Sequence, residues 1–138
     1  MTKRNFLVLG LFLLSAAAFS PVSGNPAPKG IFDQWPELGA FHTVMSETFH
    51  PMEEGNFEPI RTRSGEMVQK AKALAKAKIP AEFNNPKMAD AVKRLAKGSS
   101  KLNKMIKKKA TDEQLTASLT GLHDVFHEIV GLCRDEKH

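Results

Sequence analysis

Apolar residues recur every three or four positions along most of the chain, which is the spacing of one face of an α-helix. The pattern predicts four helices, over about residues 34–49, 57–78, 86–110 and 111–134, and no stretch shows the alternation typical of a strand. The residues expected to face inward share this helical spacing: Leu38, His42, Met45 and Phe49; Ile60, Ser64, Met67, Ala71 and Leu74; Met88, Ala91, Val92, Leu95, Leu102, Met105 and Ile106; and Leu115, Leu119, Leu122, Phe126, Ile129 and Cys133.

Polar and proline residues mark the expected helix ends. Pro51 disfavours helix at the residue before it, so the first helix is expected to stop there. Asn56 and Asn85 are suited to cap the second and third helices. Thr111 and Gln114 have the spacing of a capping box at the start of the fourth. Four helices joined by short loops predict an all-α fold, an antiparallel up-down-up-down four-helix bundle over residues 34–138.

The first residues have the pattern of an export signal. Lys3 and Arg4 precede the uncharged run FLVLGLFLLSAAAF, which is short for a membrane span, and small residues suited to cleavage follow. We place the cut after Gly24, so that residues 1–24 are a signal peptide and residues 25–33 a flexible leader rich in Pro and Gly. The protein is therefore expected in the periplasm or secreted, with no membrane span after cleavage.

Composition and charge restrict the classes of partner. Removing Lys3 and Arg4, the charged residues of the signal peptide, lowers the formal net charge from +5 to +3, too little to indicate a nucleic-acid partner. Cys133 is the single cysteine, so no internal disulfide can form; it is expected to pack as a small hydrophobe. Helix packing, a cofactor or a homodimer must then supply the stability of this small bundle.

Charge is also unevenly distributed along the chain. Residues 31–56 carry five acidic residues and no Lys or Arg, whereas residues 86–110 carry nine basic residues and one Asp. Two solvated helix faces of opposite sign explain this pattern. The alternative is a basic surface that binds an acidic partner or an anionic lipid.

Two histidines four residues apart interrupt the apolar pattern of the last helix, in the stretch GLHDVFHEIVGLC. Each residue adds about 1.5 Å to the length of a helix. Counted from the shared end of the first and fourth helices, His42 lies level with His123, and His127 lies one turn away. Met67 of the second helix falls at the same height, and Met45 is near His42. These five residues are therefore expected to converge.

Such a group has the chemistry of a metal site. Imidazoles at positions i and i+4 can bind one ion, and a third from a facing helix completes a set that suits zinc, copper or nickel. A thioether ligand from Met45 or Met67 would favour copper. Alternatively, these histidines are ordinary edge and core residues, and the methionines fill the core. His50 and His138 are expected to lie outside the set.

The chain resembles the cytochrome c-prime superfamily, which includes small b-type cytochromes, over about residues 34–133. The resemblance depends on the export signal, four helices in this order, and the stretch VFHEIV around His127. It implies haem held without covalent bonds between His127 and either Met45 or His42. The stretch HDVFH has His123 and Phe126 where the family's Cys-x-x-Cys-His motif has cysteines, so covalent haem attachment is excluded.

Three functions follow from these observations. The first is sequestration or transfer of a copper or zinc ion, with a redox or metal-transfer protein as partner. The second is electron transfer by non-covalent haem b, and the third is a cofactor-free structural or interaction bundle. An enzyme is not expected, because no Ser-His-Asp order, phosphate-binding Gly-rich loop or carboxylate pair in a cleft is evident.

Overall fold

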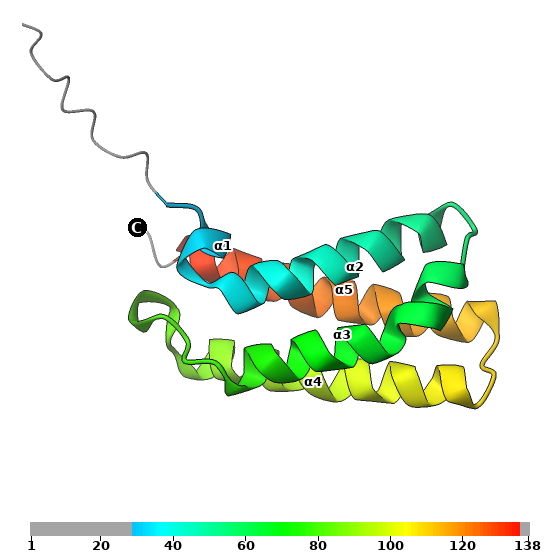
Figure 1. Ribbon diagram of the computed structural model, residues 1–138. Coiled ribbons are helices and arrows are strands. Elements are labelled where there is room, and N and C mark those ends of the chain that lie inside the picture. Colours follow the sequence, from blue (N-terminus) through cyan, green and yellow to red (C-terminus); the bar gives the residue numbers. More distant parts are fainter. Residues whose placement is uncertain (1–28, 136–138) are drawn as a thin grey trace, which may run out of the picture.

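The computed structural model describes residues 29–135, and every regular element in that range is helical (Figure 1). The expected signal peptide, leader residues 25–28 and His138 lie outside the described residues. The elements in chain order are α1 (Ile31–Gln34), α2 (Pro36–Glu53), α3 (Glu58–Lys76), the 3₁₀ turn η1 (Ala81–Phe83), α4 (Pro86–Lys107) and α5 (Asp112–Asp135). None of these helices has the length and apolarity needed to cross a bilayer.

The four long helices lie alongside one another and share one core (Figure 1). α2 contacts α3, α3 contacts α4, α4 contacts α5, and α5 also contacts α2. The residues predicted to face inward are buried, except His42, Met105 and Ile106, which are partly buried. The helical periodicity therefore identified most of the core, and the contact between α2 and α5 brings the first and last long helices together.

Two of the predicted caps form as expected. The Asn85 side chain accepts a hydrogen bond from the backbone N–H of Met88 at 2.9 Å. At the start of α5, the Gln114 N–H donates to Thr111 Oγ1 at 3.3 Å, and the Thr111 N–H donates to Gln114 Oε1 at 3.1 Å. These reciprocal bonds are the predicted capping box, and they satisfy backbone donors that a helix start leaves open.

The sequence pattern predicted that the first long helix stops before Pro51, and this prediction is wrong. α2 continues through Pro51 to Glu53. After the proline, backbone hydrogen bonds complete the end of the helix. The Glu54 N–H donates to the His50 carbonyl at 3.3 Å, and the Asn56 N–H donates to the Pro51 carbonyl at 2.8 Å. Burial of Met52 also stabilises the added turn. This turn places His50 and Glu53 three residues apart on one helix.

A short helix precedes α2 where a flexible leader was expected. α1 begins after Gly30, whose N–H donates to Asp33 Oδ2 at 3.0 Å. Phe32 of this turn lies against Gly39 of α2, where an added Cβ would come within 3.2 Å of the Phe32 Cβ. Glycine therefore permits this close approach, and α1 holds the Phe32 ring beside the first turns of α2.

Candidate metal centre

A pocket of about 260 Å³ lies at the contact between α2 and α5. Four imidazoles and one thioether are among the groups around it, so its lining is rich in nitrogen and sulfur donors. The lining residues are His42, Met45, Ser46 and His50 from α2, and His123, Phe126 and His127 from α5.

His123 and His127 form the closest pair of donors in this pocket. Their Nε2 atoms lie 3.2 Å apart, with ring centroids 4.4 Å apart in an edge-to-face arrangement. Residues four apart are neighbours on a helix surface, so the backbone of α5 sets this geometry. Two imidazole nitrogens bound to one tetrahedral ion at about 2.0–2.1 Å would lie about 3.3 Å apart. This separation is close to the one in the structure, where the two nitrogens are within hydrogen-bond distance, so a shared ion would replace the proton between them.

The surroundings of His123 favour its neutral form. Burial lowers the pKa of His123, and the neighbouring His127 lowers it further, whereas Asp124 and Glu53 act weakly in the opposite direction. One face of the ring also stacks on Phe49, with centroids 3.8 Å apart. The neutral form that these surroundings favour is also the form of imidazole that can bind a metal ion.

The pocket contains one of the two methionines that were predicted to take part. Met45 is almost completely buried and lines the pocket. Met67 does not line it, because the side chain is fully buried in the core from α3. Heights counted along the helices do not give the direction of a side chain, and Met67 is the one predicted ligand that does not line the pocket.

His42 lies at the same pocket but is held by aromatic stacking. Its ring lies between Phe32 and Phe126, with centroid distances of 4.9 and 5.3 Å and an interplanar angle of 14° in each case. Within residues 29–135, no three His, Cys, Asp or Glu side chains form a group that could hold a metal ion. The predicted set of three histidines is thus not assembled, since Phe32 and Phe126 fix the His42 ring.

His50, which was expected outside the site, lines the pocket. Its Nδ1 lies 3.1 Å from Glu53 Oε2, and 63% of its side chain is exposed. The sequence prediction left it out because counting along the helix placed His50 about two turns from the expected site, toward Pro51. The spacing of His42, Met45 and His50, at i, i+3 and i+8, fits one side of a continuous helix and could have indicated it.

The contact between His123 and His127 also affects whether His127 could bind haem. An axial haem ligand needs its Nε2 directed at iron, with the porphyrin plane across the bond. In the structure the His127 Nε2 instead lies 3.2 Å from the His123 Nε2, within hydrogen-bond distance. Haem binding through His127 would therefore require the His123 ring to move.

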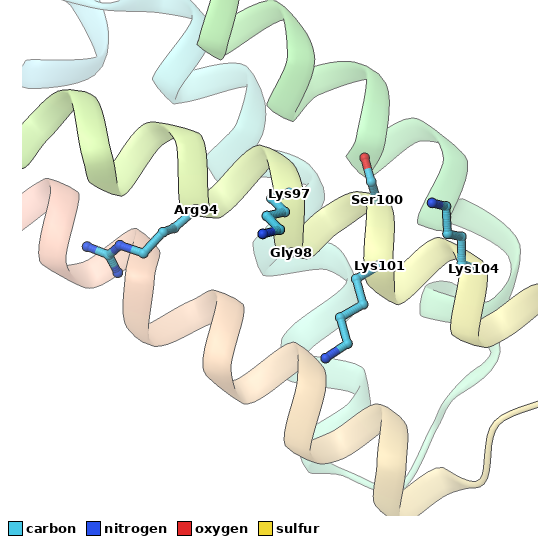
Figure 2. Close-up of a pocket in the computed structure, with 6 residues that line it drawn as sticks. All are labelled: Arg94, Lys97, Gly98, Ser100, Lys101 and Lys104. Atoms are coloured by element: carbon cyan, nitrogen blue, oxygen red, sulfur yellow. The ribbon is translucent and has the colours of Figure 1, made fainter.

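A second hollow, of about 610 Å³, lies on the basic surface of α4. Figure 2 shows Arg94 and Lys101 extending from α4 toward α5. Arg94 is bonded to Asp90 at 2.7 Å and to Glu128 of α5 at 2.6 Å. The full lining is Arg94, Lys97, Gly98, Ser100, Lys101 and Lys104. The alternative prediction of a basic surface for an acidic partner or an anionic lipid falls on this groove.

Comparison with protein-family models, curated proteins and solved structures finds no match for this chain. No family is assigned on that basis. The resemblance to the cytochrome c-prime superfamily stays an interpretation of helix order and of the residues around His127.

Proposed function

We propose that this chain is an exported, cytochrome c-prime-like four-helix bundle of antiparallel up-down-up-down topology that binds a copper or zinc ion for sequestration or transfer. His123 and His127 would hold the ion, with Met45 as a neighbouring donor from α2. His42 lines the same pocket but would have to leave its stacking between Phe32 and Phe126 to join them. The observation that carries this proposal is the 3.2 Å separation of the two Nε2 atoms at a pocket lined by two more histidines and a methionine.

The donor set favours particular metals. Imidazole suits both zinc and copper, whereas a thioether is a soft ligand that favours copper, in particular Cu(I). Met45 lines the pocket, and His127 is exposed on α5. An ion at this position would be accessible to a metal-transfer or redox partner, which supports transfer rather than permanent structural binding.

Metal analysis of the tag-free protein tests the proposal. We expect one copper or zinc ion per chain, and at least about tenfold weaker binding in His123→Ala. The control is His138→Ala, which removes the one histidine outside the described residues. Unchanged affinity in His123→Ala would contradict the proposal. A Soret band would favour haem b, and a metal-free, colourless protein that retains a partner at low salt would favour an interaction bundle.

A further inference from the structure

His50 occupies an exposed position at the end of α2, beside the paired histidines of α5. The Phe49 ring connects the two places, because it stacks on His123 at 3.8 Å and contacts the His50 ring edge-on at 5.8 Å. His50 lines the same pocket as His123 and His127. Its exposed imidazole is therefore one of the two that α2 contributes to the pocket beside the α5 pair.

Glu53 determines which nitrogen of His50 is available. The carboxylate Oε2 lies 3.1 Å from Nδ1 and can only accept, so Nδ1 carries the proton and donates it. The lone pair of the neutral ring is then on Nε2. Histidines that bind metals almost always donate their other N–H to a carboxylate, a carbonyl or water, which fixes the tautomer and orients the ring. His50 and Glu53 form such a pair.

His42 and His50, the two further histidines of the pocket, differ in how freely their side chains can rotate. His42 is stacked between Phe32 and Phe126, so turning its ring breaks two aromatic contacts. The side chains of His50 and Glu53 are 63% and 54% exposed, so His50 can turn with little loss of packing. It must turn to reach an ion, because no three such ligands form a ready group within the described residues. His50 is thus better able than His42 to move onto an ion already held by the α5 pair.

We propose that His50, oriented by Glu53, is the third imidazole ligand of the ion held by His123 and His127. The inference rests on the proposed metal-binding function and identifies the ligand that completes its site. The ligand class is a copper or zinc ion. Glu53 is a positioning residue, because it acts through the His50 ring.

Copper titration with electron paramagnetic resonance tests this assignment on the purified chain, with Cu²⁺ as the probe. We expect His50→Ala to weaken binding at least about tenfold and to remove one imidazole nitrogen from the copper spectrum. Glu53→Gln should weaken binding about tenfold and alter the copper–nitrogen coupling, yet keep the number of nitrogens. Glu54→Gln is the matched control, because it removes the same charge from the adjacent exposed residue.

The outcomes separate the two proposals. If His123→Ala weakens binding but His50→Ala matches the wild type in affinity and spectrum, the proposed function stands and His50 is not a ligand. If Glu53→Gln behaves as Glu54→Gln does, the positioning role of Glu53 is wrong. If the wild-type chain binds no Cu²⁺, the metal-binding function and this inference fail together.

Discussion

His123 combines features that rarely occur together on a surface histidine. It stacks on Phe49, its Nε2 faces that of His127, and burial and His127 both lower its pKa. A histidine without such contacts at the edge of a bundle would be free to turn into water, and its pKa would not be lowered. The His123 ring is therefore restrained by packing and biased toward its neutral form, although it lies on the edge of the apolar stripe.

The lowered pKa of His123 predicts that the metal-free protein loses stability in acid. Below the ordinary pKa of histidine the unfolded chain binds a proton at this residue before the folded chain does. The stability that neutral His123 contributes is fully present above the pKa of histidine in the unfolded chain. It is lost as the pH falls through the lower pKa that His123 has in the folded chain. Urea unfolding with a chelator, from pH 7.5 to pH 5, measures it against His123→Gln. An unfolding free-energy difference between the two proteins that stays constant with pH would contradict the prediction.

At the scale of the helices, packing depends on where side chains are small. Gly98 of α4 is one such position, because an added Cβ would lie 2.6 Å from Cδ2 of Leu122 on α5. Gly121, on α5 itself, has nothing within 4 Å of an added Cβ. Both glycines lie in helices, but only Gly98 is required by the close approach of a neighbouring side chain.

Replacing each glycine by alanine should separate these effects. Gly121→Ala is expected to raise the unfolding free energy by about 0.5–1 kcal/mol, the usual gain in a helix interior. The unfolding free energy of Gly98→Ala should be lower than that of Gly121→Ala by about 1 kcal/mol or more, because Leu122 must move in a packed core. Thermal and urea unfolding measure both variants. Equal stabilisation of the two would show that α4 and α5 do not approach as closely as described.

The proposed copper or zinc ion should stabilise the folded chain as a whole. A ligand that binds only the folded state at 100 times its Kd adds about 2.7 kcal/mol, which for a domain of this size raises Tm on the order of 10 °C. Thermal unfolding with and without buffered Cu²⁺ or Zn²⁺ measures this shift. His123→Ala should reduce the shift strongly, and His138→Ala should leave it unchanged. A full shift in His123→Ala would place the ion elsewhere on the chain.

Taken as a whole molecule, the protein separates scaffold from site. Most of the core comes from residues at helical spacing, such as Leu74 or Leu119, and these are buried as expected. The site draws instead on residues at the edges of that pattern. Their side chains can turn toward the core, a neighbour or water, so the periodicity that identifies the core leaves their contacts open.

The sequence by itself determined the long helices, their inward faces and the caps at Asn85 and Thr111, because these depend on residues three or four positions apart. It also determined that His123 and His127 are neighbours, for the same reason. Only the tertiary structure decided which residues of the other helices join them. Met52 is buried in the added turn of α2 beyond Pro51, His50 of the same helix lines the pocket, and stacking on Phe126 restrains His42. These outcomes depend on contacts between segments far apart in the chain, which local spacing does not encode.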